Sequence, residues 1–167
     1  MSHTITRPRR LAAGLVVAAA AAATTLLGAA PASAATPILV RMSGGSLMII
    51  TGTNLGDRAS TVGGNPNVVV TSSTGPVAAG TGCQQQSGAA VLCTGVSSIR
   101  FSGGAGNDVF RNDTAVRSDQ FGEAGNDQLI GGSGRDFLRG GGDADAAADK
   151  DGIDDCITEI ESSTCEL

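Results

Sequence analysis

The sequence predicts an all-β protein in which short strands stack as parallel β-helical coils. A nine-residue pattern of glycine, aspartate and one large apolar residue recurs between Gly103 and Ile157. Short β-branched runs separated by Gly-Gly and Gly-Pro turns fill residues 37–101, and no helical periodicity occurs after residue 34. These observations favour strands over helices throughout the chain that follows the first 34 residues.

The repeat has the form G-G-x-G-x-D-x-U-x, where U is a large apolar residue. Glycine at the first, second and fourth positions allows positive φ and a tight turn, and the x-U-x triplet is a short strand whose middle side chain points inward. Three clear copies and then two weaker ones occupy residues 103–111, 122–130, 131–139, 140–148 and 149–157. The expected inward column contains Phe101, Phe110, Leu129, Leu138, Ala147 and Cys156.

Each copy places one carboxylate at the same point of its turn. Two copies make one coil, so Asp108, Asp127 and Asp145 are expected to stack on one edge, and Asp136 and Asp154 on the other. Carboxylates about 5 Å apart repel unless a cation lies between them, and calcium accepts six to eight oxygen ligands in flexible geometry. A metal-free, glycine-rich β-meander is the alternative, but three copies in phase favour calcium.

The pattern resembles the RTX (hemolysin-type) calcium-binding repeat, and the whole chain resembles small secreted proteins of this kind from Gram-positive bacteria. The resemblance implies a parallel β-roll over residues 103–157 that binds Ca²⁺ through its turns. The expected calcium-binding positions are Gly103, Gly104, Gly106, Asn107, Asp108, Gly122, Gly125, Asn126, Asp127, Gly131, Gly132, Gly134, Asp136, Asp145 and Asp154.

Between Asn112 and Phe121 the repeat degenerates and gains one residue. Either Gln120 or Phe121 must therefore take the inward position there, and the insertion can be absorbed as a bulge. The resemblance does not extend to this segment, so Asp113 and Asp119 are not expected to be calcium ligands.

The C-terminal copies are the most ambiguous. Residues 143–148 fit the repeat poorly, and a frayed loop or a helical turn is an alternative there. Residues 149–156 fit the repeat but also resemble the D-x-D-G-x-x-D calcium loops of thrombospondin type 3 repeats. Either interpretation predicts a cation-binding loop.

The first 34 residues have the pattern of a secretory signal peptide. Three arginines precede an apolar stretch over residues 11–27, and Ala32-Ser33-Ala34 supplies a small-residue cleavage site. A membrane anchor is the alternative, because the apolar run is only slightly short for a span. Cleavage predicts a secreted, extracellular protein that begins at Ala35 and has no membrane span.

Composition argues against catalysis and against nucleic-acid binding. Removing the signal peptide takes away three of the eleven basic residues and none of the sixteen acidic ones, which leaves a net charge of −8. It also removes His3, the one histidine, and the chain has no Trp or Tyr. Such a chain lacks the usual groups for acid–base chemistry at neutral pH and the basic patches that phosphates require.

Four cysteines in an exported chain predict two disulfides. Of the three possible connectivities the simplest joins Cys83 to Cys93 and Cys156 to Cys165, across two short loops. A four-thiolate zinc site is the alternative, and these spacings do not favour it.

Residues 35–102 are expected to form a β-strand cap or degenerate coils that continue the stack. The candidate strands cover residues 38–42, 47–51, 67–71, 89–92 and 98–101, and Thr51–Asp57 resembles a degenerate turn of the repeat. Residues 158–167 are expected to be an acidic tail that a disulfide holds in place.

These features predict a secreted, calcium-binding β-roll protein that is not an enzyme. We expect calcium-dependent folding and a structural or cell-surface role in the extracellular space, with a partner that the sequence does not identify. The alternative is an accessory module of an extracellular adhesin or of a secreted hydrolase system, again without its own catalytic site.

Overall fold

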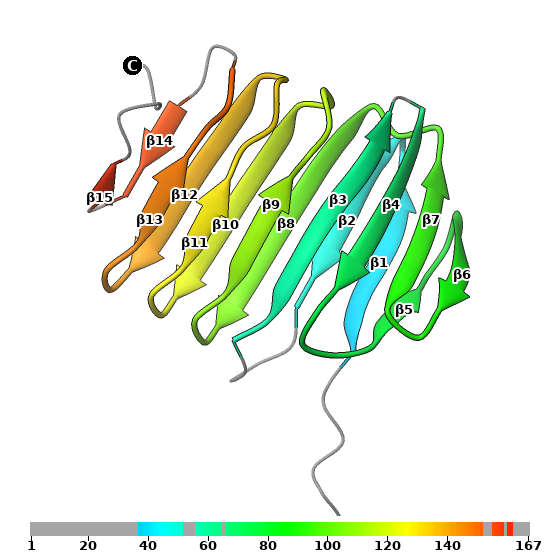
Figure 1. The fold of residues 1–167 in the computed structure, drawn as a ribbon, viewed down its shortest axis with the longest axis horizontal. Coiled ribbons are helices and arrows are strands. Elements are labelled where there is room, and N and C mark those ends of the chain that lie inside the picture. The colour runs from blue at the N-terminus through cyan, green and yellow to red at the C-terminus, as the bar shows by residue number, and fades with distance from the viewer. Residues whose placement is uncertain (1–36, 52–55, 65, 152–154, 159, 162–167) are drawn as a thin grey trace, which may run out of the picture. The chain divides into compact units, whose positions relative to one another are not determined.

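The computed structural model describes residues 37–161, apart from 52–55, 65, 152–154 and 159 (Figure 1). Every regular element in the described residues is a β-strand, so the predicted all-β class is confirmed. No helix in this part of the chain is long and apolar enough to cross a membrane. The predicted signal peptide, Cys165 and most of the predicted acidic tail lie outside the described residues.

The strands form two sheets. The seven-stranded sheet has the order β14-β12-β10-β8-β2-β1-β5, and the eight-stranded sheet has the order β15-β13-β11-β9-β3-β4-β7-β6. The strands are β1 (Ile38–Ser43), β2 (Ser46–Ile50), β3 (Arg58–Gly64), β4 (Asn67–Ser72), β5 (Val77–Ala79), β6 (Cys83–Ser87), β7 (Ala90–Thr94), β8 (Ser98–Ala105), β9 (Val109–Asn112), β10 (Ser118–Ala124), β11 (Gln128–Ile130), β12 (Asp136–Gly142), β13 (Ala146–Ala148), β14 (Asp155–Ile157) and β15 (Ile160–Glu161).

From β8 onward the chain alternates between the two sheets, and all pairing is parallel (Figure 1). Strands β8, β10, β12 and β14 pair side by side in one sheet, and β9, β11, β13 and β15 in the other. Each expected x-U-x triplet lies in a strand. This includes β13, where Ala147 is buried and fills the inward slot beside Leu129, so the fraying considered for residues 143–148 is not found over Ala146–Ala148.

The first half of the fold is mostly antiparallel, so both sheets are mixed. Strands β2 and β3 pair in parallel with β8 and β9 and continue the stack by one coil. Antiparallel pairing then joins β1 to β2, β4 to β3, β7 to β4 and β6 to β7. The segment before the repeats therefore combines the two arrangements expected for it, one degenerate coil and an antiparallel cap.

Five strands in this first half were predicted, but β3, β5 and β6 were not. The β6 segment was expected to be a loop, yet it forms the outermost strand of its sheet and pairs with β7. Cys83 and Cys93 face each other directly in this pair and form the predicted disulfide. Cys156 is buried in β14, and its predicted partner Cys165 lies outside the described residues.

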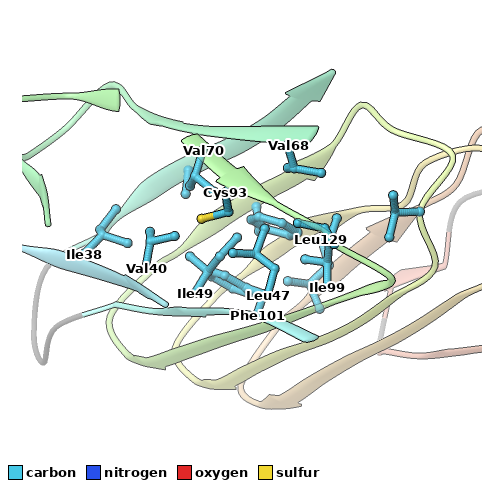
Figure 2. Close-up of a cluster of buried hydrophobic side chains, with 14 of the residues drawn as sticks. Ile38, Val40, Leu47, Ile49, Val68, Val70, Cys93, Ile99, Phe101 and Leu129 are labelled. Atoms are coloured by element: carbon cyan, nitrogen blue, oxygen red, sulfur yellow. The ribbon is translucent and has the colours of Figure 1, made fainter. Parts of the chain in front are cut away.

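The space between the sheets is filled by the inward column and by apolar residues of the cap (Figure 2). The rings of Phe101 and Phe110 stack across it, with centroids 4.5 Å apart. Gln120 takes the inward slot in register with Phe101 and Leu138, and it is fully buried. Phe121 faces outward, so the inserted residue is absorbed in the turn between β9 and β10 rather than within a strand.

Candidate metal centre

The turns between the sheets lie on two edges. The Asp108 edge comprises the link that ends at Asp57 and the turns over residues 103–108, 122–127 and 140–145. The Asp136 edge comprises the turns that follow β9, β11 and β13, over residues 113–117, 131–136 and 149–154. The structure describes the Asp108 edge from Gly56 onward and the Asp136 edge as far as residue 151.

Buried aspartates on the Asp108 edge form a ladder. The backbone N–H of Asp108 donates to Oδ1 of Asp127 at 2.7 Å, and the N–H of Asp127 donates to Oδ1 of Asp145 at 2.9 Å. The N–H of Asp57 extends the series by donating to Oδ1 of Asp108 at 2.7 Å. The expected stack of three carboxylates is therefore present, and Asp57 adds a fourth position that was not among the expected sites.

The second carboxylate oxygen differs from the first. Oδ2 of Asp108 and Oδ2 of Asp127 are buried and have no hydrogen-bond partner among the described residues. Burial raises the pKa of Asp108 to about 7; the N–H of Asp57 opposes the rise, and the charges of Asp127, Asp57 and Glu123 add to it. Burial also raises the pKa of Asp127, with Asp145 among the contributing charges. Ionised carboxylates in these positions require a nearby positive charge.

The absence of a side chain at the first glycine lets that oxygen and a carbonyl oxygen of the next coil approach the backbone closely. A Cβ on Gly122 would overlap Oδ2 of Asp127 and would lie 2.7 Å from the carbonyl oxygen of Gly140. A Cβ on Gly103 would lie 2.8 Å from Oδ2 of Asp108 and 2.6 Å from the carbonyl oxygen of Gly122. Carboxylate and carbonyl oxygens thus meet at a point that any side chain would fill.

Positive φ occurs at the second and fourth positions of these turns and not at the first. Gly104 has φ 89°, Gly106 has φ 122° and Gly125 has φ 120°. The expectation of positive φ at the first glycine was wrong. Glycine is required there because neighbouring oxygens lie where a Cβ would be. Glu123 at a second position (φ 81°) and Asp143 at a fourth (φ 74°) adopt the same conformation without the freedom of glycine.

The asparagines at the fifth position form a separate ladder nearer to solvent. Oδ1 of Asn107 accepts the N–H of Asn126 at 2.9 Å, and Oδ1 of Asn126 accepts the N–H of Ala144 at 3.1 Å. Both side chains therefore support the next turn. They were expected among the calcium-binding positions, and in this structure their amide oxygens already accept backbone hydrogen bonds.

On the Asp136 edge, protein donors occupy the carboxylate. Oδ1 of Asp136 accepts the N–H and the hydroxyl of Ser118 at 2.7 and 2.5 Å, and Oδ2 accepts the N–H of Gly132 at 2.7 Å. Asp149 is buried nearby, since a Cβ on Gly131 would overlap Oδ1 of Asp149 and would lie 3.0 Å from Oδ2 of Asp136. Asp149 was not expected at the site because it stands where the repeat has glycine.

The conformation of this second edge also differs. None of the three glycines expected there, Gly131, Gly132 and Gly134, has positive φ. Asp154, the other carboxylate expected on this edge, lies outside the described residues.

The turn with the inserted residue replaces carboxylates by uncharged groups. Oδ1 of Asn112 accepts hydrogen bonds from the hydroxyls of Thr61 at 3.0 Å and Thr114 at 2.7 Å, while its Nδ2 donates to the carbonyl of Val116 at 2.9 Å. Asp113 points away from this network and pairs with Arg111 and Lys150.

Asp119 forms an ion pair with Arg117 at 3.5 Å on the outer surface. Neither Asp113 nor Asp119 belongs to a carboxylate ladder, which agrees with their exclusion from the expected ligands.

The donors on the Asp108 edge suit a hard cation. Among the described residues no cluster of three or more acidic, histidine or cysteine side chains could hold a metal ion alone. Backbone carbonyls of the glycine turns would have to complete any coordination shell, which gives a set of oxygen ligands only. Calcium prefers such a set and tolerates irregular geometry. The buried Oδ2 atoms and the carbonyl oxygens that converge beside the first glycines therefore fit a calcium ion.

Comparison with known families agrees with this geometry. Residues 100–113 and 121–146 match the RTX calcium-binding nonapeptide repeat, in four copies. The chain carries RTX calcium-binding repeats. The matched RTX segments omit residues 114–120, which contain most of the hydrogen-bonded turn after β9 and the inward Gln120. No curated protein and no solved structure matches the chain.

Proposed function

We propose that the protein is a secreted calcium-binding β-roll protein whose RTX repeats fold when calcium binds. The observation that carries the proposal is the pair of buried Oδ2 atoms of Asp108 and Asp127, which face glycine backbone and have no hydrogen-bond partner among the described residues. Burying an ionised carboxylate without a compensating charge is costly, and a cation removes that cost.

Asp108 and Asp127 would hold the ion, together with carbonyl oxygens such as those of Gly122 and Gly140. Bound calcium supplies the positive charge that keeps these carboxylates ionised inside the fold. The chain's own contribution is to position the oxygens, since each Oδ1 is fixed by the N–H of the preceding aspartate in the ladder. In the folded repeats each carboxylate is therefore oriented by the backbone of the preceding turn.

A structural or cell-surface role in the extracellular space is the function that these features support best. Export is supported by the signal-peptide pattern of residues 1–34, and an oxidising compartment by the Cys83–Cys93 disulfide. We propose that the protein is not an enzyme, because the chain after residue 34 contains no histidine and no nucleophile–base motif.

Calcium titration of the mature protein from Ala35 tests the proposal. Residues 103–142 contain eleven glycines, each of which loses more backbone entropy on ordering than other residues do. Extracellular modules bind calcium at about 0.1–1 mM, so millimolar calcium contributes roughly 1–2 kcal/mol per site. Far-UV circular dichroism is expected to show strand signal rising cooperatively in this range, with magnesium much weaker. Identical spectra in calcium and in chelator would refute calcium-dependent folding.

A further inference from the structure

Two of the four phenylalanines lie on the outer face of the seven-stranded sheet instead of in the core. The rings of Phe121 in β10 and Phe137 in β12 are in contact, with centroids 5.9 Å apart. The guanidinium of Arg100 in β8 lies over the Phe121 ring, 4.8 Å from its centroid. Neither ring contributes to the buried core between the sheets. In a chain with so few aromatic residues, this pair needs a reason beyond folding.

The sheet is hollowed beside Phe121. Glu123, two residues further along β10, is flanked in register by Gly104 on one neighbouring strand and Gly141 on the other. A hollow of about 420 Å³ lies there, with Gly140 and Gly141 in its lining. Arg100, Ser102, Phe121, Glu123 and Arg139 surround it. A volume of this order accommodates a single sugar or a similarly sized group.

A second hollow of about 310 Å³ lies on the same face, beside Phe137. Its lining also has two arginines (Arg117 and Arg135) and one phenylalanine, but Arg117 pairs with Asp119, and Asp136 and Asp155 add two more carboxylates. Phe121 lines the first hollow and Phe137 the second, and the two rings are in contact. The first hollow is therefore the site for an anion, and the ring pair connects it to the second.

The arginines of the first hollow are available to a ligand. Neither Arg100 nor Arg139 forms an ion pair with a carboxylate in the described part of the chain. By contrast, Arg111 and Lys150 on the Asp136 edge both pair with Asp113. On a protein with a net charge of −5, two unpaired guanidiniums beside one ring mark a site for an anion.

We propose that this outer face binds an acidic polysaccharide through its uronate units. A uronate carries a carboxylate for Arg139 and Arg100, an apolar ring face for Phe121 and hydroxyl donors for the carboxylate of Glu123. Glu123 already accepts a hydrogen bond from the hydroxyl of Ser102, which leaves its remaining acceptor positions for sugar hydroxyls.

Other anions satisfy fewer of these groups. A bare phosphate or sulfate would be repelled by Glu123 and would not use the ring. A free zwitterionic amino acid could place its carboxylate on an arginine and its ammonium on Glu123. It would contact only the first hollow, however, whereas an oligomer can also extend over the contacting rings of Phe121 and Phe137 towards Arg135. These further contacts favour the polysaccharide.

Saturation-transfer NMR with trigalacturonate tests the proposal, at one fixed calcium concentration that keeps the mature protein folded. The matched ligand is the methyl ester of the same trisaccharide, which keeps the rings but lacks the charge. We expect transfer to the sugar C–H protons of trigalacturonate and an affinity about tenfold weaker for the ester. Arg139→Gln and Phe121→Ala should each weaken trigalacturonate binding about tenfold.

The control variant is Arg58→Gln, which removes an exposed arginine from the other sheet and should leave binding unchanged. Circular dichroism of every variant in calcium separates loss of the site from loss of the fold, and with it from failure of the proposed calcium function. Equal binding of acid and ester would overturn the proposal. So would equal losses in Arg139→Gln and Arg58→Gln, no transfer from either sugar, or tighter binding of free phenylalanine than of trigalacturonate.

Discussion

The two edges of the repeat stack present the same kind of turn with opposite electrostatic solutions. On the Asp108 edge the buried carboxylates form a ladder. Oδ2 of Asp108 and Oδ2 of Asp127 receive no hydrogen bond from the described residues. On the Asp136 edge, Ser118 and Gly132 donate to both oxygens of Asp136, and the turn after β9 uses Asn112 and threonine hydroxyls. We propose that a cation completes the Asp108 edge, whereas internal hydrogen bonds hold Asp136 and the turn after β9.

The two edges show that the nonapeptide consensus does not determine which groups contact the carboxylate of each turn. Gly131, Gly132 and Gly134 fit the consensus better than Gly140 to Asp145 do, yet the Asp136 carboxylate already has protein donors. The proposed role of calcium rests on which carboxylate oxygens lack donors, and the donors to Asp136 come from its own turn and from the neighbouring coil.

The largest loss of unfolding free energy is expected from adding a side-chain atom at Gly122 on the Asp108 edge. In Gly122→Ala the new Cβ overlaps Oδ2 of Asp127 and crowds the carbonyl of Gly140, so unfolding free energy in calcium should fall by about 3 kcal/mol. Chemical denaturation measures the change. Gly88→Ala is the control, because its Cβ would meet no atom within 4 Å, and it should be nearly neutral. Equal effects of the two substitutions would contradict the close packing of oxygens around Gly122.

The next effect should be independent of calcium. Asn112→Ala removes the acceptor of the Thr61 and Thr114 hydroxyls and the donor to the Val116 carbonyl, all of which are buried. Unfolding free energy should fall by about 2 kcal/mol, by the same amount at 1 and at 10 mM calcium. A loss that shrinks as calcium rises would show that this turn also takes part in ion binding.

The effect of Asp127→Asn on folding is expected to be unfavourable in calcium and slightly favourable in chelator. Asparagine keeps an Oδ1 for the Asp108 N–H but removes the charge, so the calcium midpoint should rise about tenfold. In chelator the same substitution should slightly raise the residual strand signal, because it removes a buried charge next to Asp108 and Asp145. Far-UV circular dichroism in both conditions measures this. A lower strand signal in chelator would mean that the ladder is not strained by its charges.

The smallest effect concerns pH. The pKa of Asp108 is raised from 3.8 to about 7 in the folded protein, so between pH 5 and 7 the folded state binds more protons than the unfolded state. In chelator the strand signal that remains should therefore be larger at pH 5 than at pH 7.5. Far-UV circular dichroism against pH measures the change, and Asp108→Asn should flatten it. The calcium concentration at the midpoint of folding should rise as pH falls, because protons and calcium compete for the same oxygens.

The features that the nine-residue period controls could be predicted from the sequence. The strand triplets and the ladder through Asp108, Asp127 and Asp145 follow from spacing alone, because residues eighteen or nineteen apart must meet on one edge. The disulfide between Cys83 and Cys93 followed from export and proximity. The antiparallel strands β3 and β6 escaped notice because their polar sequences lack the alternation that identifies a strand.

What the sequence could not predict depends on neighbours across strands. A one-residue insertion between β9 and β10 fits either Gln120 or Phe121 inward, and only packing between the sheets decides. Asp57 and Asp149 join the carboxylates through coils whose consensus is almost lost. The hollow beside Phe121 is lined by residues of β8, β10 and β12, which come together only after the register is set.

Gln120 gives the stack a reference point along its length. Coils built from near-identical nonapeptides can slip past one another by a whole repeat with little loss of packing. The buried amide of Gln120 donates to the Ser118 hydroxyl of its own strand at 2.9 Å and to the Ile130 carbonyl of β11 at 3.2 Å, and only the second bond depends on how the strands are aligned. A stack that slipped by one repeat would have to re-form that bond elsewhere. The one polar member of the inward column thus acts against misalignment, as a single buried asparagine does in a coiled coil.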